Sequence, residues 1–259
     1  MEIIIGILIF IFGIIIGSFL NVCIIRIPDK KSIVIHPSSC PRCGTRLTTA
    51  DLVPVFSYIF LRGKCRHCQH KISLIYPFVE LLTGVLFVLL YIKFALGYDL
   101  LIYAALTSLL IVISFIDLSS MIIPNGLIIA GFVVSAIKLA AAITTGIFEN
   151  WTEYIIGFFA GALPLLLIAM FCTYILKKEA LGGGDIKLMA FAGLIIGWKL
   201  TIVAYIIGII SGALVGILLL STGKKNRGDE IPFGPFLSAG VIVSVFFGTE
   251  LINWYVGLL

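Results

Sequence analysis

The chain has 259 residues, of which 61% are hydrophobic and 12% are charged, and its mean hydropathy is +1.19. This composition is far more apolar than that of an average water-soluble domain, so it excludes a soluble globular fold. The formal net charge is +5. Because the basic residues gather in a few loops between apolar runs, we attribute this charge to membrane topology and expect no nucleic-acid binding.

Apolar runs separated by short polar loops predict membrane-spanning helices, because about 20 residues are needed to cross the hydrocarbon layer. In lipid these runs must be helices, since the backbone has no water to bond. The first run has no basic residues before it and no small-residue cleavage site after it, so we interpret it as a retained helix. The predicted helices lie near residues 3–25, 74–96, 100–117, 122–143, 153–176, 186–198, 200–221 and 235–257.

These runs predict an all-α polytopic integral membrane protein with about eight transmembrane helices, the sixth being the shortest. Glycines four residues apart, such as Gly157 and Gly161, indicate helix faces that pack closely. An N-terminus outside the membrane places all but three of the 18 basic residues on one side, the exceptions being Lys93, Lys138 and Lys199. Basic residues accumulate in cytoplasmic loops, so this side is predicted to be the cytoplasm.

The one large polar segment, residues 26–73, carries two C-x-x-C pairs. Each pair aims two thiolates at one point, and two pairs complete a tetrahedral four-sulfur shell typical of structural zinc. The sequence therefore predicts a cytoplasmic zinc-binding loop, in which zinc has a structural role. The predicted metal ligands are Cys40, Cys43, Cys65 and Cys68.

Two disulfides are the alternative for this loop, but a reducing cytoplasm disfavours them. The chain's three histidines, His36, His67 and His70, also lie in the loop. Because four cysteines close the shell, we interpret the histidines as ordinary residues of a basic loop, with His67 as an alternative ligand. The remaining thiols, Cys23 and Cys172, lie in apolar runs and are interpreted as buried hydrophobic residues.

Three acidic residues need an explanation, because charged groups at membrane depth are costly: Glu80, Asp117 and Asp185. Asp117 and Asp185 are both predicted at the cytoplasmic membrane surface. Two carboxylates brought together can share one proton, so that one activates water and the other protonates a leaving group. Three glycines precede Asp185 and permit a close backbone approach. The alternatives are a helix N-cap for Asp185 and a solvated interfacial position for Asp117.

The order of several motifs resembles the bifunctional type IV prepilin peptidases, which are aspartyl proteases of the G-x-G-D class. Both C-x-x-C pairs resemble the zinc loop of that family, and the resemblance covers nearly the whole chain. The other matching segments are G-S-F-L-N-V (17–22), D-L-V-P-V-F-S-Y (51–58), Y-P-F-V-E-L-L-T-G (76–84), Asp117 with Ile123 and Pro124, G-G-G-D-I-K-L (182–188) and I-P-F-G-P-F-L (231–237).

The resemblance implies cleavage of a basic leader from prepilins and pseudopilins at the cytoplasmic face of a bacterial inner membrane. It implies Asp117 and Asp185 as the catalytic residues, the four cysteines as structural ligands, and S-adenosylmethionine as donor for methylating the new N-terminal residue. It also implies two regions: residues 1–97, linked to methylation, and residues 98–259, the peptidase domain. Glu80 is expected to contact the substrate's new amino terminus or a basic partner, unless it is a capped or snorkelling carboxylate at the interface.

Two departures concern the region linked to methylation. The family usually has Asp-Asn where this chain has Asp51-Leu52, and an aromatic and a basic residue where Leu74 and Ile75 follow Ile-Ser. A peptidase without methyltransferase activity is therefore one alternative. A secondary transporter is a more distant one, because membrane carboxylates and interrupted helices also mark ion paths. A zinc-loop assembly factor without chemistry leaves the aspartates unexplained.

Overall fold

The computed structural model describes residues 2–35, 37–145, 151–175, 177, 182–226 and 229–258. Some residues used in the predictions above lie outside these ranges. They are His36 of the polar loop, Leu176 at the predicted end of a span, and the basic residues Lys178 and Arg227.

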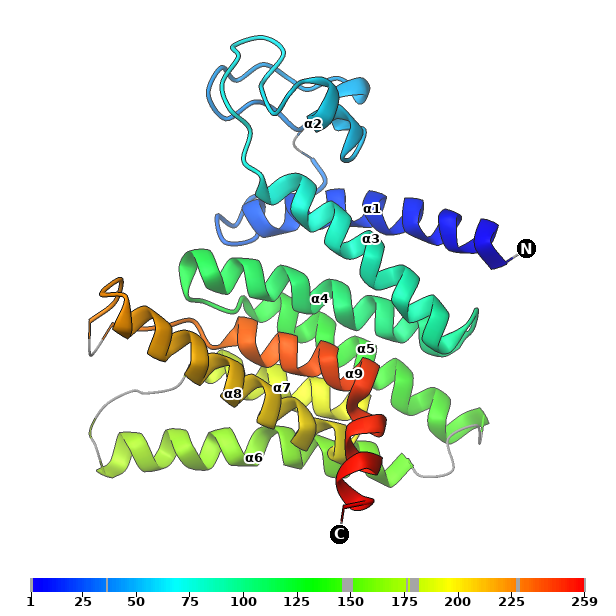
Figure 1. Cartoon of the computed structure of the whole chain (residues 1–259), viewed down its shortest axis with the longest axis vertical. Coiled ribbons are helices and arrows are strands. Elements are labelled where there is room, and N and C mark those ends of the chain that lie inside the picture. The colour runs from blue at the N-terminus through cyan, green and yellow to red at the C-terminus, as the bar shows by residue number, and fades with distance from the viewer. Residues whose placement is uncertain are drawn as a thin grey trace. The chain divides into compact units, whose positions relative to one another are not determined.

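The described residues form helices joined by short connections, so the all-α prediction is confirmed. Figure 1 shows them in chain order. They are α1 (Glu2–Arg26), the 3-10 helix η1 (Thr49–Leu52), α2 (Phe56–Phe60), α3 (Ile75–Phe94), α4 (Tyr98–Ser120), α5 (Asn125–Thr145), α6 (Trp151–Ile175), α7 (Gly183–Ile196), α8 (Trp198–Ser221) and α9 (Gly234–Val256).

Seven of these helices are long and apolar enough to cross a membrane: α1, α3, α4, α5, α6, α8 and α9. The predicted polytopic membrane protein is thereby confirmed, and every predicted span matches a helix. The sixth span is α7, whose 14 residues rise only about 21 Å. Since the hydrocarbon layer is about 30 Å thick, the expected eight spans are seven long helices and one short one.

The chain forms two compact units, and the division falls inside α4, between Val112 and Ile113. In the first unit α1 packs against α3. The contact is close, because a Cβ atom at Gly17 would lie 2.7 Å from the Cα atom of Glu80. The buried side chain of Asn21 adds a polar link, donating to the Tyr76 carbonyl at 3.0 Å. The predicted regions 1–97 and 98–259 stay a prediction.

In the second unit α7 is the central helix, and α5, α6, α8 and α9 all contact it. Most of its side chains are therefore buried. The contact with α6 depends on small residues, as the glycine spacing predicted: a Cβ atom at Gly161 would lie 2.0 Å from the Met189 carbonyl oxygen. The Tyr205 hydroxyl of α8 donates to the carbonyl of Gly161 and joins a third helix to this contact.

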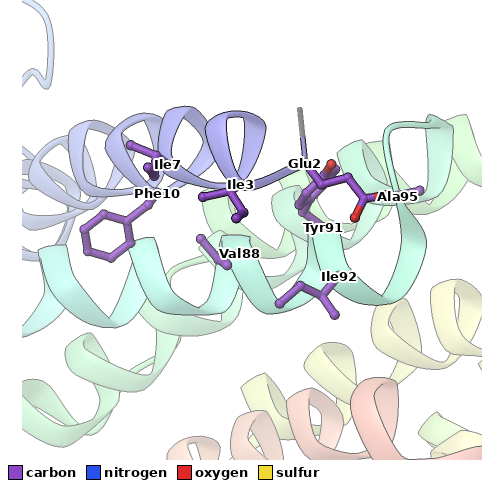
Figure 2. Close-up of a pocket in the computed structure, with 9 residues that line it drawn as sticks. Glu2, Ile3, Ile7, Phe10, Val88, Tyr91, Ile92 and Ala95 are labelled. Carbon is purple, nitrogen blue, oxygen red and sulfur yellow. The ribbon is translucent and has the colours of Figure 1, made fainter.

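An apolar hollow lies in the first unit between α1 and α3 (Figure 2). Ile3, Ile7 and Phe10 line it from α1, while Val88 and Ile92 line it from α3. None of the cysteines or buried carboxylates singled out above takes part in its lining. We therefore treat this hollow as separate from the candidate functional residues.

Candidate functional site

The four loop cysteines converge in the first unit. Their sulfur atoms all lie within 4.8 Å of one another, and the Sγ atoms of Cys40 and Cys68 are 3.8 Å apart. Zinc–sulfur bonds of about 2.3 Å in a tetrahedron place neighbouring sulfur atoms about 3.8 Å apart. The predicted ligands are thus brought together, and their geometry fits a metal ion.

The two halves of this cluster are built alike. The Cys40 amide donates to the Thr45 carbonyl, and the Cys65 amide donates to the His70 carbonyl. In both halves an isolated bridge closes the turn, from Ser39 to Arg46 and from Lys64 to Lys71. Residues in the left-handed conformation occupy equivalent places, Gly44 with φ 69° and Gln69 with φ 57°. Each turn therefore aims its two thiols inward in the same way.

Hydrogen bonds lower the pKa of two of the four cysteines, Cys43 and Cys65, and so favour the thiolate form that a metal requires at these positions. Cys43 Sγ lies 3.3 Å from the Thr45 hydroxyl, and hydrogen bonding with Thr45 lowers the pKa of Cys43 to about 6. His70 is engaged elsewhere, because its Nδ1 atom lies 2.9 Å from Arg42 Nη1. Among the described residues, the group able to hold a metal contains these four cysteines and no histidine.

Asp51 ties the connector between the two halves to the second half. Its carboxylate accepts hydrogen bonds from the Thr48 hydroxyl at 2.7 Å and the Thr48 amide at 3.1 Å. The Arg66 Nε atom lies 2.9 Å from the other oxygen. The Thr48 hydrogen bonds, followed by Arg66, lower the pKa of Asp51, so the carboxylate stays ionised.

Glu80 connects the cysteine loop, residues 26–73, to the packed helices α1 and α3. It is buried in α3, with 7% of its surface exposed, and its Oε2 atom accepts the Val55 amide at 2.7 Å. The Ser18 side chain of α1 also bonds to it. Val55 precedes α2 and has φ 63°, an uncommon value for a β-branched residue. Glu80 therefore does not snorkel at the interface, since it fixes a strained turn of the loop against both helices.

Asp117 lies in the second unit, in the last turn of α4. The structure extends this helix three residues past the predicted end, to Ser120. Asp117 is not a solvated interfacial residue as the alternative supposed, because only 6% of its surface is exposed. Its Oδ2 atom accepts the Gly234 amide at 3.0 Å, at the first residue of α9. A Cβ atom at position 234 would lie 2.8 Å from the same oxygen, so glycine permits this approach.

Asp185 is the third residue of α7 and 8% exposed. The helix is capped by Gly182, so the alternative role of Asp185 as N-cap is wrong. Its Oδ1 atom is buried and has no hydrogen-bond partner in the part of the chain that the structure describes. The charge of Asp117 acts on Asp185 electrostatically. Both predicted carboxylates are therefore buried in the same compact unit, close enough for their charges to interact.

Gly184, the residue just before Asp185, permits a close contact with the connection between α4 and α5. A Cβ atom at Gly184 would lie 2.8 Å from the Cβ atom of Ile123. Lys187 donates to the Asn125 side chain at 3.3 Å, which adds a polar link between α7 and the start of α5. These contacts hold the segment after Asp117 beside the segment that carries Asp185.

Sequence reasoning did not single out Gly234, although it lies in the matching segment 231–237. A glycine followed by Pro235 at a helix start was the available signal, because proline favours the first helical positions. The contact with Val55 was likewise missed, and no local sequence signal indicated it.

Comparisons with known proteins cover both units. Residues 11–94 match the model of the Bacterial Peptidase A24 N-terminal domain, and residues 104–217 match that of the Type IV leader peptidase family. A protein of Bacillus subtilis (strain 168) is 37% identical over 249 residues, covering 96% of this chain and 97% of its own length. One of Aeromonas hydrophila is 31% identical over 276 residues, covering 96% and 92%.

Both relatives carry the name prepilin leader peptidase/N-methyltransferase. A protein of Myxococcus xanthus with the same name is 36% identical over 226 residues, covering 87% of this chain and 66% of its own length. No solved structure matches the chain. Family models along most of the chain, together with a relative matched over nearly its full length, show that this chain belongs to the type IV leader peptidase family.

Proposed function

We propose that this protein is an aspartyl endopeptidase that removes the basic leader of type IV prepilins and pseudopilins, with Asp117 and Asp185 as the catalytic residues. The observation that carries the proposal is the burial of these two carboxylates in one site of a family member. Family membership favours this activity over a secondary transporter or an assembly factor.

The proposed chemistry requires one ionised and one protonated carboxyl. Repulsion between two buried carboxylates disfavours the doubly charged state, so the pair holds a proton near neutral pH. The ionised member then takes a proton from water, and the protonated member donates to the leaving amine. Burial strengthens the electrostatic interaction between the two carboxyl groups and their interactions with the reacting groups, because water no longer screens the charges.

The test is cleavage of a prepilin by the purified protein in liposomes. Asp117→Asn and Asp185→Asn should each lower the rate by at least about 10²-fold, as expected for loss of general acid or base catalysis. The matched control is Asp51→Asn, which changes an aspartate that lies in the first unit. Full activity in either site variant, with wild-type folding, would show that this aspartate is not catalytic.

We also propose that the enzyme methylates the new N-terminal residue with S-adenosylmethionine as donor. The names of the relatives support this activity. The proposal concerns the reaction and assigns no residues to S-adenosylmethionine. Transfer of labelled methyl groups to processed pilin tests it, and cleavage without incorporation would leave a peptidase alone.

The four-cysteine cluster is proposed to hold a structural zinc ion. Four converging thiols with the sulfur spacing of a tetrahedral shell support zinc over oxygen-preferring metals. A shell closed by four sulfurs leaves no open position for substrate, so zinc would supply stability to the loop. Elemental analysis of the purified protein should give about one equivalent of zinc, and a value well below one would reject the site.

We further propose that the protein lies in the bacterial inner membrane, with the cysteine loop and the aspartates at the cytoplasmic side. The distribution of basic residues supports this orientation. A prepilin has its basic leader in the cytoplasm and an apolar helix in the bilayer, so its cleavage site would lie near this face. Thiol labelling of Lys64→Cys in intact cells tests the orientation, since an impermeant reagent outside the cell should not reach that position, and labelling of this residue would contradict it.

A further inference from the structure

The two buried carboxylates have different surroundings. Asp117 Oδ2 accepts the backbone amide of Gly234, the first residue of α9. Asp185 Oδ1 is buried, and none of the described residues donates a hydrogen bond to it. The other oxygen of Asp185 is directed toward Gly182, where a Cβ atom would lie 3.4 Å away. The pair is therefore asymmetric before any substrate binds.

This asymmetry favours the ionised form of one carboxyl and the protonated form of the other. An amide N–H aimed at a carboxylate stabilises the ionised form, and the amide at a helix start also carries the positive end of the helix dipole. A buried oxygen without a donor is costly when charged, whereas a protonated carboxyl is neutral and tolerates that environment better. Each effect acts on a different member of the pair.

We propose that Asp117 carries the negative charge of the resting enzyme and Asp185 carries the proton, and that the Gly234 amide is the positioning group that sets this order. The inference rests on the proposed peptidase function and adds which carboxyl is the general base and which is the general acid. Gly234 acts through its backbone amide, which donates to Asp117 and does not titrate, so its role is to position and not to react.

The assignment fixes the direction of proton flow during cleavage. Asp117 takes one proton from water while the water oxygen bonds to the scissile carbonyl carbon. Asp185 then gives its proton to the amide nitrogen as the carbon–nitrogen bond breaks. The products leave with Asp117 protonated and Asp185 ionised, and transfer of one proton from Asp117 to Asp185 restores the resting state.

Other titratable groups near the pair do not replace Asp185 as donor. Tyr205 of α8 lies close enough to sense the charge of Asp185, but its hydroxyl donates to the Gly161 carbonyl. Lys187, two residues after Asp185 on α7, is exposed and donates to Asn125 of α5. The α9 face contributes the Gly234 amide, which does not titrate.

The first test compares pH profiles of kcat/KM for prepilin cleavage. Gly234→Ala places a Cβ atom against Asp117 Oδ2 and displaces it from the amide. Losing that donor weakens the ionised form, so the acidic limb of the profile should move to higher pH. The matched control is Gly126→Ala, because that glycine has no atom within 4 Å of an added Cβ. An acidic limb that stays in place would overturn the role of Gly234.

The second test does not depend on activity, so it separates this inference from the proposed function. Infrared spectra at neutral pH distinguish a protonated carboxyl from a carboxylate by their carbonyl bands. Both proteins carry Glu80→Gln, because the buried Glu80 carboxyl absorbs in the same region when it is protonated. In this background, the protein with Asp185 should show a protonated buried carboxyl, and Asp185→Asn should lose it. A band that persists in Asp185→Asn, or its absence from the protein with Asp185, would overturn the assignment, even if Gly234→Ala failed to fold.

Discussion

Buried polar side chains chosen from the two units differ in their hydrogen bonding. In the first unit, the polar side chains of Asn21 and Glu80 each bind a backbone group. In the second, Asp185 and Ser238 of α9 each keep one buried oxygen that no described residue bonds. Fully bonded buried groups make a structure specific, whereas an unbonded one costs stability and retains the capacity to react. The comparison contrasts Glu80, whose carboxylate is bonded to the loop, with Asp185, the proposed proton donor.

Removing the metal should have the largest effect and should be confined to the first unit. Folding of small metal modules depends on the metal, because their loops have little core of their own. Chelation, or Cys40→Ser, should abolish hydrogen-exchange protection in the cysteine loop and leave α7 protected. Cys172→Ser is the control, since that thiol lies in α6 outside the cluster. Loss of protection in α7 after chelation would contradict the separation of the units.

Gly161→Ala should instead destabilise the second unit. The added Cβ atom would lie 2.0 Å from the Met189 carbonyl oxygen, so α6 and α7 must move apart. Overpacking of this kind costs about 1–3 kcal/mol, occasionally more. Thermal unfolding in detergent measures the loss, with Gly126→Ala as the matched substitution at an open position. Equal stability of the two variants would show that α6 and α7 are not packed this closely.

Glu80→Ala tests whether the bonded carboxylate of the first unit is structural. It removes the acceptor of the Val55 amide and leaves a polar group without its partner, which costs about 1–3 kcal/mol. Glu80→Gln keeps an acceptor and should cost less. Hydrogen exchange at Val55 reports the local effect directly. If both variants exchange as slowly as wild type, this contact does not hold the loop.

Arg66→Ala should have the smallest effect. The arginine side chain is 53% exposed, and exposed ion pairs contribute up to about 1 kcal/mol. Asp51 retains both Thr48 hydrogen bonds, so its lowered pKa should persist in part. The stability that Asp51 contributes is present above the ordinary pKa of about 3.9 and is lost as pH falls through the lowered value. Acid unfolding of the loop in wild type and variant measures the difference.

Much of the fold followed from the lengths of the apolar runs. Each span needs a minimum length in lipid and must bond its backbone internally, so composition alone identified the helices. Their ends were less certain, because local contacts decide them. Met121, in the left-handed conformation with φ 53°, donates its amide to the Asp117 carbonyl past the predicted end of α4. η1 and α2 were missed since they are short and depend on the cysteine loop around them.

The candidate site was predicted only as a set of residues. Both aspartates and all four cysteines were identified, the cysteines from their spacing and the aspartates from the cost of charge at membrane depth. Their meeting was not deducible, because 67 residues, which include α5 and α6, lie between Asp117 and Asp185. The zinc cluster was easier, since each C-x-x-C pair preforms half of the shell locally.

The sequence by itself determined the helical membrane fold, the paired thiols and the family motifs, because these depend on composition and short spacing. Only the tertiary structure decided that Gly234 binds Asp117, that no described residue donates to Asp185 Oδ1, and that Glu80 binds Val55. The physical reason is that hydrogen bonding of a buried carboxyl depends on which distant backbone amides the helix packing brings within about 3 Å.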